Sequence, residues 1–301
     1  MEPLTLSRIV YGTMRLAGEP REIVERIKAC LDLGITTFDL ADIYGDFEFE
    51  ELFGKALALE PELRPRMQIV TKCDIVPNGK RDAWVTHYNA SRDYILSCVN
   101  RSLEKIQTDY IDLLLLHRPD PLLNPDEVAS AFEELYASKK VRHFGVSNFT
   151  PSQFRLVQSR LPAHLSLQTN QIEFSVLHTA PIFDGTLDQL LEIRAVPMAW
   201  SPLAGGANAW PRGGGLFGSN KTEQDKRVVA ALEKVADQLG PDVGIDHVAY
   251  AWLFLHPSQP RLVVGTNDLA RLKRAVDSTV LKLNRQQWYY ILEASQGQPV
   301  P

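Results

Sequence analysis

The run Ile111-Asp112-Leu113-Leu114-Leu115-Leu116-His117 decides the fold of this chain. Apart from Asp112 it is aliphatic up to His117, whereas a strand with one face in water alternates apolar and polar residues. Such a strand is buried on both faces, which is typical of a parallel sheet covered by helices. Residues 125–139 then show helical periodicity, and Asn124-Pro125 places a capping residue before a proline suited to the first helical turn. This part of the chain is therefore predicted to form one strand-helix unit.

The same alternation recurs along the whole sequence. Short apolar, β-rich runs are expected to be strands at residues 8–12, 36–41, 68–72, 111–117, 141–146, 168–172, 196–200 and 261–264. Helical periodicity covers residues 21–33, 48–59, 92–105, 125–139, 151–159, 187–194, 222–256 and 269–281. Eight such units predict an α/β protein with a single (β/α)8 TIM barrel of parallel strands, and an open doubly wound sheet is the alternative. Residues 284–295 are expected to form an additional C-terminal helix.

Length and composition restrict the class of protein. The 301 residues contain no linker rich in Pro, Gly or Ser, so residues 1–301 are interpreted as a single barrel domain. The net charge of -5 argues against binding to nucleic-acid phosphates, and the three cysteines lack metal-ligand spacing, so we expect reduced core thiols and no metal. No secretion signal and no apolar run of about 20 residues is found, which predicts a cytoplasmic protein that does not bind membranes.

One glycine-rich segment matches a known dinucleotide-binding pattern. The run Gly213-Gly214-Gly215-Leu216-Phe217-Gly218 satisfies the G-x-G-x-x-G pattern of dinucleotide-binding open sheets. No predicted strand precedes it and no clear helix follows it, so we reject that interpretation. The irregular segment 203–220 is instead a candidate lid over the mouth of the barrel.

Polar side chains end several of the apolar runs. Asp39 lies near the end of the second predicted strand with Tyr44 in the loop after it, Lys72 ends the third strand, and His117 ends the fourth. In a parallel barrel these ends meet at one face, so the four groups are expected to converge. Reduction of a carbonyl needs a proton donor, and a tyrosine with a pKa near ~10 needs tuning for this task. We expect Lys72 to lower the pKa of Tyr44, Asp39 to keep Lys72 charged, and His117 to orient the carbonyl oxygen.

These residues lie in a longer set of motifs. Residues 38–45 read FDLADIYG, and they are followed in order by IVTK at 69–72, LH at 116–117, GVSNF at 145–149, NQIE at 170–173 and WSPL at 200–203. The set covers essentially the whole chain and resembles the aldo-keto reductase superfamily, in particular a bacterial oxidoreductase branch of it. The resemblance implies an NADP(H)-dependent oxidoreductase in which Tyr44 is the general acid or base, Lys72 and Asp39 tune it, and His117 orients the substrate.

The resemblance also implies a cofactor site. By this match Ser147, Asn148 and Gln171 hydrogen-bond the nicotinamide carboxamide and Trp200 stacks under the ring. The cofactor phosphates and adenosine ribose are placed along Ser201, Leu203, Gly205, Gly206, Gly265, Thr266 and Arg271.

Arg271 favours NADP(H), because an arginine near a helix start suits a 2′-phosphate. Two positions depart from the usual family pattern. Gly265 stands where many members have a lysine, and Arg274-Ala275 stands where many have an acid followed by an amide.

Two other functions remain as alternatives. A strand-end lysine such as Lys72 could act as a Schiff-base nucleophile in a lyase, although the neighbouring Asp39 argues against a neutral amine. A nucleotide-binding redox sensor is the other alternative. The expected partner is a small-molecule carbonyl substrate, and we expect a monomer. Arg118 is interpreted as an ion-pair partner of Asp120 or Asp126, with contact to an anionic substrate group as the second possibility.

Overall fold

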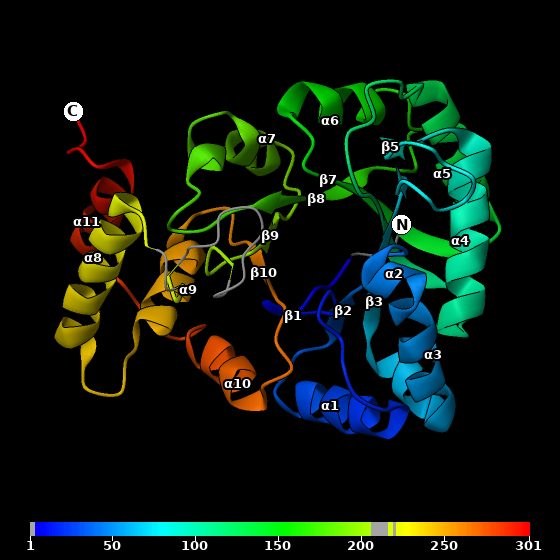
Figure 1. Cartoon of the computed structure of the whole chain (residues 1–301). Coiled ribbons are helices and arrows are strands. Elements are labelled where there is room, and N and C mark those ends of the chain that lie inside the picture. The colour runs from blue at the N-terminus through cyan, green and yellow to red at the C-terminus, as the bar shows by residue number, and fades with distance from the viewer. Residues whose placement is uncertain (1–3, 206–215, 219–220) are drawn as a thin grey trace. The chain divides into compact units, whose positions relative to one another are not determined.

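The computed structural model describes residues 4–205, 216–218 and 221–301 (Figure 1). Eight parallel strands close into a barrel in the order β1-β10-β9-β8-β7-β6-β3-β2, which confirms the predicted (β/α)8 architecture and excludes the doubly wound alternative. The barrel strands are β1 (Ile9–Gly12), β2 (Thr37–Asp39), β3 (Gln68–Cys73), β6 (Ile111–Leu116), β7 (Val141–Ser147), β8 (Leu167–Glu173), β9 (Met198–Trp200) and β10 (Arg261–Val264). Each lies within about two residues of a predicted apolar run, because a fully buried strand has an apolar sequence.

The helices also follow the periodicity. They are α1 (Pro20–Asp32), α2 (Tyr44–Phe47), α3 (Phe49–Leu59), α4 (Arg92–Ile106), α5 (Pro125–Ala137), α6 (Pro151–Gln158), α7 (Thr186–Glu192), α8 (Glu223–Leu239), α9 (Ile245–Leu255), α10 (Leu269–Asp277) and α11 (Arg285–Gln296). The predicted stretch 222–256 is in fact two helices, α8 and α9. The break follows from Gly240, which has a φ of 131°, and from Pro241, whose ring cannot continue a helix.

A short antiparallel hairpin was not predicted. Strands β4 (Ile75–Val76) and β5 (His87–Tyr88) pair just after β3, and each is too short to show a period of two in the sequence. The loop between them, residues 77–86, is referred to below as the hairpin loop.

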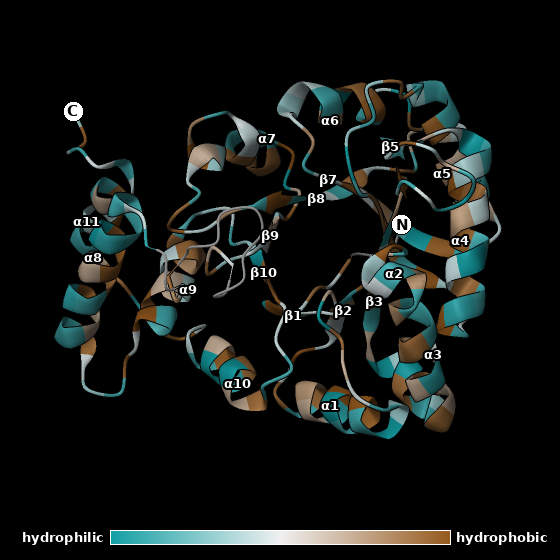
Figure 2. Ribbon diagram, in the orientation of Figure 1, coloured by the Kyte–Doolittle hydropathy of each residue, from teal (hydrophilic) through white to brown (hydrophobic). Residues whose placement is uncertain are grey.

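The chain forms two compact units. The first comprises residues 1–171 and 265–269, and the second comprises residues 172–264 and 270–301. In the first unit β3 pairs with β6 so that Lys72 lies opposite Leu115 and Cys73 opposite Leu116. Helices α1, α3, α4 and α5 of this unit carry hydrophobic and hydrophilic residues on different faces (Figure 2), and residues such as Ile23, Phe53 and Phe132 bury the apolar face.

In the second unit the C-terminal helix has a defined packing partner. The Trp252 indole N–H donates to the Trp288 carbonyl at 2.9 Å, the Trp288 indole N–H donates to the Trp252 carbonyl at 3.1 Å, and the rings stack 5.0 Å apart. These reciprocal contacts hold α11 against α9, so the predicted extra helix is part of the core of this unit.

The structure also describes the cysteines and the apolar character of the helices. Cys30, Cys73 and Cys98 are all buried and free. None of the helices in the described part of the chain has the length and apolar character needed to cross a bilayer.

Candidate active site

Lys72 lies at the centre of a polar cluster in the first unit. Its side chain is fully buried, and its Nζ donates hydrogen bonds to Asp39 Oδ2 at 2.7 Å, to the Leu40 carbonyl at 2.8 Å and to Tyr44 Oη at 3.2 Å. An ammonium group has three protons, so these three acceptors satisfy it completely. A buried cation of this kind is tolerated because Asp39, itself 2% exposed, supplies the opposite charge.

Local backbone geometry brings Tyr44 to this ammonium. The Asp42 amide donates to the Lys72 carbonyl at 3.0 Å, which extends the β2–β3 contact past the end of β2. The chain then turns through Gly45, whose φ is 58°, and a Cβ built there would lie 2.2 Å from the Phe49 ring. Only glycine fits this turn, which explains the glycine directly after Tyr44.

The pKa shifts define the charge state of the cluster. Burial by itself lowers the pKa of Lys72, but Asp39 and Tyr44 outweigh it and the pKa lies above its ordinary value. For Tyr44, burial is the largest effect and raises the pKa, Lys72 opposes it and Asp39 adds to it. Lys72 lowers the pKa of Tyr44 as expected, but desolvation of the phenolate exceeds the attraction of the ammonium, so the pKa of Tyr44 lies above its ordinary value. The cluster holds a protonated phenol and a charged lysine, and a charged lysine is not a nucleophile for Schiff-base formation.

His117 is the fourth predicted group, and the structure places it beside Tyr44. The two rings lie 6.0 Å apart, edge to face, and the His117 amide donates to the Cys73 carbonyl at 2.9 Å. Burial, and then the charges of Lys72 and Arg118, hold the pKa of His117 well below its usual value. A neutral imidazole remains, and it can donate one N–H to a substrate oxygen.

A contact that the sequence did not predict fixes Asp39. Gln171 Nε2 donates to Asp39 Oδ1 at 2.8 Å, so both carboxylate oxygens have a donor. Around Gln171 lie two other predicted residues: Ser147 Oγ donates to the Gln171 carbonyl at 2.9 Å, and Asn148 Nδ2 donates to Ser147 Oγ at 2.8 Å. The structure thus brings Ser147, Asn148 and Gln171 together at the ends of β7 and β8, next to Asp39.

Asp74 is a further residue that sequence reasoning missed. It is fully buried with a φ of 99°, and its carboxylate accepts the Arg118 amide at 3.2 and 3.1 Å. It thereby fixes the backbone directly after His117. A left-handed conformation at a residue other than glycine is unfavourable and is not visible as a motif in the sequence.

The acids expected to pair with Arg118 have other partners. Asp120 accepts the backbone amides of Ala90 and Leu122, and Asp126 lies 3.2 Å from Arg160. The charge of Arg118 also lowers the pKa values of Tyr44 and His117.

Gly265 and Thr266 follow β10 and belong to the first unit. The Gly265 carbonyl accepts Arg15 Nη1 at 3.3 Å, and a Cβ built on Gly265 would meet no atom closer than 3.5 Å. Thr266 Oγ1 accepts the Asp268 amide at 3.2 Å.

The other predicted cofactor residues belong to the second unit. Trp200 ends β9 and is half-buried, and Ser201, Leu203 and Gly205 follow it. Ser201 and Gly205 have φ values of 50° and 77°, and the Ala204 amide donates to the Ser201 carbonyl at 2.7 Å. Gly206 and most of the predicted lid, 203–220, lie outside the described residues.

Helix α10 carries two arginines in different situations. Arg274 pairs with Asp246 through its Nε at 2.7 Å, while Arg271 is exposed.

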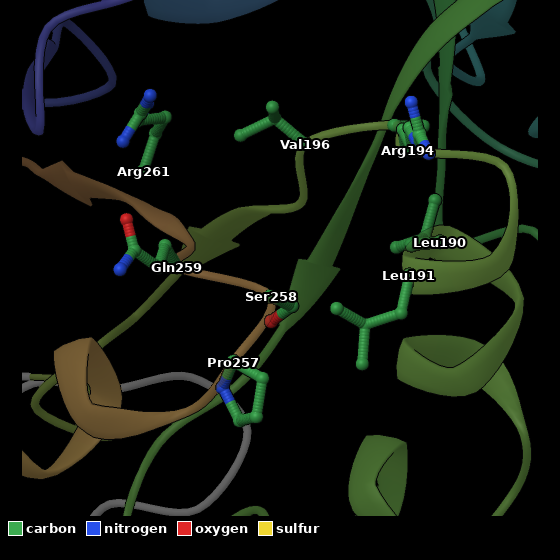
Figure 3. A pocket seen from close by; sticks show the side chains of 9 residues that line it. Leu190, Leu191, Arg194, Val196, Pro257, Ser258, Gln259 and Arg261 are labelled. Atoms are coloured by element: carbon green, nitrogen blue, oxygen red, sulfur yellow. The ribbon is translucent and has the colours of Figure 1, made fainter.

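A pocket elsewhere in the second unit has a volume of about 280 Å³ and is shown in Figure 3. Its lining includes Leu190, Arg194 and Ser258, together with Val196 and Arg261, which lie at or before the start of β9 and β10. Chemistry in this type of barrel takes place at the opposite, carboxyl ends of the strands, and no predicted site residue lines this pocket. It is therefore not the candidate active site.

Both the amino-acid sequence and the fold match known proteins. Residues 8–296 match the model of the "Aldo/keto reductase family". The chain is 46% identical to oxidoreductase YdhF of Escherichia coli over 98% of its own length and 95% of that protein's. It is 41% identical to a 6-dehydroglucose reductase of Agrobacterium fabrum, with 99% and 97% covered. A crystal structure of a thermostable aldo-keto reductase with the inhibitor epalrestat superposes with a TM-score of 0.77 at 25% identity, covering 97% of each chain.

Proposed function

Because this chain belongs to the aldo/keto reductase family of oxidoreductases, we propose that it reduces aldehydes or ketones to alcohols with hydride from NADPH. The observation that carries this proposal is the position of Lys72, whose Nζ contacts Asp39 Oδ2 at 2.7 Å and Tyr44 Oη at 3.2 Å. A carbonyl that accepts hydride needs a proton at its oxygen, and a neutral phenol beside a fixed ammonium can provide it.

The roles of the four residues follow from their charge states. Tyr44 Oη donates the proton to the forming alkoxide, and Lys72 stabilises the phenolate that remains. Asp39 keeps Lys72 charged, and the neutral His117 donates an N–H that orients the carbonyl oxygen. Pre-positioned donors of this kind act where charge develops in the transition state.

The residues present fit a nicotinamide cofactor, which supplies the hydride when bound. A carboxamide needs both donors and acceptors, and the hydroxyl of Ser147 with the amides of Asn148 and Gln171 provides them within one hydrogen-bonded group. Trp200 is the aromatic residue proposed to stack on the ring. Ser201, Leu203, Gly205, Gly265 and Thr266 are proposed to hold the phosphates and the adenosine ribose.

The preference for NADPH is assigned to Arg271. This arginine is exposed near the start of α10. A guanidinium near a helix start suits a 2′-phosphate, which NADH lacks.

The cofactor proposal is tested by quenching of tryptophan fluorescence during titration with NADPH and NADH. NADPH should bind at least about tenfold tighter, equivalent to about 1.4 kcal/mol, and Arg271→Ala should remove that difference. Lys273→Ala is the matched control, because Lys273 is an exposed cation of the same helix that pairs with Asp277. Equal affinities for the two nucleotides in the unaltered protein would contradict the assignment.

The reaction is tested by following NADPH oxidation with a panel of aldehydes and ketones. The panel should include 6-dehydroglucose, because two relatives of this chain are 6-dehydroglucose reductases. Tyr44→Phe should keep nucleotide affinity and lose turnover by about 10² to 10⁴-fold. Tight nucleotide binding without turnover on any carbonyl would instead support the redox-sensor alternative.

A further inference from the structure

Two of the three cysteines lie close to each other, and one of them directly follows Lys72 in the chain. Cys73 follows Lys72 at the end of β3, and Cys98 lies on α4; each is 1% exposed. The two thiols lie close enough to shift each other's pKa. The third cysteine, Cys30, lies on α1 and is also buried, so it provides an internal comparison.

The surroundings of Cys98 are unusual for a core thiol. Arg101 Nη2 lies 3.1 Å from Cys98 Sγ, and Arg81 Nη1 of the hairpin loop lies 3.6 Å from it. Two guanidinium groups around one sulfur stabilise its thiolate form, which is the reactive form. A purely structural cysteine in an apolar core has no need of such partners.

The two sulfurs differ in acidity: the pKa of Cys98 is lowered and that of Cys73 is raised, as in a pair with one attacking thiolate. The hydrogen bond from Cys73 is the largest effect that lowers the pKa of Cys98; burial opposes it, and Arg101 and Arg81 lower it further. The pKa of Cys73 is raised well above its ordinary value, first by that same hydrogen bond and then by burial. For Cys30, burial raises the pKa to about 12. The pair therefore combines a thiol of lowered pKa with a thiol of raised pKa, whereas the pKa of Cys30 is raised by burial alone.

One of the side chains that contact Cys98 is partly exposed. Arg81 is a residue of the hairpin loop with a φ of 52°, its side chain is 27% exposed, and its guanidinium lies 4.6 Å from the Phe47 ring centroid. Its Nη1 contacts Tyr94 Oη as well as Cys98 Sγ, and its Nη2 lies 3.5 Å from Asp42 Oδ2. For a small molecule to reach Cys98 from this side, Arg81 would have to leave these partners.

We propose that Cys98 and Cys73 form a peroxide-reactive dithiol in which oxidation to a disulfide switches off the active site. The Cys98 thiolate attacks one oxygen of hydrogen peroxide, which forms an S–O bond, breaks the O–O bond and releases hydroxide. The Cys73 sulfur then attacks the sulfenic acid of Cys98, so the S–S bond forms and the S–O bond breaks. The leaving hydroxide takes the Cys73 proton as water; two thiol sulfurs are oxidised and the peroxide is reduced.

The link to the active site is covalent and short. Cys73 is bonded to Lys72, and its carbonyl accepts the His117 amide at 2.9 Å. Movement of Cys73 toward α4 would shift both Lys72 and His117. A displacement of about 1 Å is enough to slow hydride transfer strongly. Oxidation is therefore expected to lower turnover, a readout that rests on the proposed function.

The test treats the full chain with hydrogen peroxide and maps disulfides by mass spectrometry without reduction. We expect a Cys73–Cys98 disulfide, loss of at least about tenfold in carbonyl-reductase activity, and recovery of both with dithiothreitol. Cys98→Ser should form no disulfide and keep its activity in peroxide, while Cys30→Ser, the matched control, should behave as the unaltered protein. Arg101→Gln should slow oxidation several-fold.

A second variant keeps the proposal testable if Cys98→Ser does not fold. Cys73→Ser should stop the reaction at the sulfenic acid of Cys98, which dimedone labels. The disulfide and the dimedone adduct need no substrate, so they are informative even if the proposed reductase activity is wrong. Oxidation of Cys30 at the same rate as Cys98, or a Cys73–Cys98 disulfide that leaves activity unchanged, would overturn the proposal.

Discussion

Gln171 Nε2 donates a 2.8 Å hydrogen bond to Asp39 Oδ1, on the carboxylate whose other oxygen pairs with Lys72. One side chain thus connects the group proposed to hold the nicotinamide carboxamide with the acid proposed to keep Lys72 charged. Asp39 is almost completely buried, so its free oxygen would otherwise have no donor.

Gln171→Leu should remove the donor to Asp39 at nearly constant side-chain volume. An unsatisfied buried carboxylate oxygen costs about 1–3 kcal/mol, so both the free energy of unfolding and kcat should fall, the latter because Lys72 is less firmly held. Urea unfolding and steady-state kinetics measure the two effects. Gln286→Leu is the control, because Gln286 is exposed on α11. An unchanged free energy of unfolding in Gln171→Leu would contradict the assigned contact.

The proton donor should stay protonated over the whole physiological range. Burial raises the pKa of Tyr44 above its ordinary value of 10.0, so titration of this phenol should not lower the rate of reduction at any pH below about 10. The profile of kcat/KM for carbonyl reduction at saturating NADPH should show no fall assigned to Tyr44 between pH 6 and 9.5. A decline of tenfold per pH unit that begins near pH 8 and is absent when alcohol oxidation is measured would disprove this charge state.

His117 should make the protein less stable in acid. Its pKa in the folded chain lies well below the unfolded value of 6.5, so the unfolded state takes up the proton first. Its contribution to stability is present above pH 6.5 and is lost as the pH falls below that value, by up to about 1.4 kcal/mol per pH unit. Urea unfolding at pH 7.5 and 5.5 should show this loss as the difference between the unaltered protein and His117→Gln. Parallel pH dependence in the two proteins would mean that the imidazole is not held neutral.

The sequence contained enough information for the barrel and for the clustering of the residues proposed to be catalytic. Buried parallel strands are apolar, and their polar end residues, Asp39, Lys72 and His117, interrupt that pattern visibly. The contact of Gln171 with Asp39 could not be predicted in this way. The two residues lie 132 positions apart, and their contact depends on how the strands are arranged in the barrel. Asp74 was missed because its role depends on a left-handed φ, and the sign of the Tyr44 pKa shift was missed because it depends on the extent of burial.

Glu50 should make the protein less stable in base. This acid is buried in α3, where Thr71 Oγ1 and Ser102 Oγ donate to its carboxylate at 2.6 and 3.0 Å, and burial raises its pKa to about 7 from an unfolded value of 4.5. A raised pKa means that the folded state holds the proton more tightly, so this contribution is fully present below pH 4.5 and is lost as the pH rises through about 7.

The loss amounts to about 3 kcal/mol by pH 8. Glu50→Gln carries no titrating proton. Its amide oxygen can accept from one of the two hydroxyls, and its NH2 can donate to the other, because a hydroxyl also accepts. Its free energy of unfolding should therefore exceed that of the unaltered protein at pH 8 and approach it at pH 5. Glu51→Gln, at an exposed position of the same helix, is the control. Urea unfolding at the two pH values measures the difference, and a stability gap between the unaltered protein and Glu50→Gln that stays constant from pH 5 to 8 would show that Glu50 is ionised throughout, with its two hydroxyl donors outweighing the cost of burial.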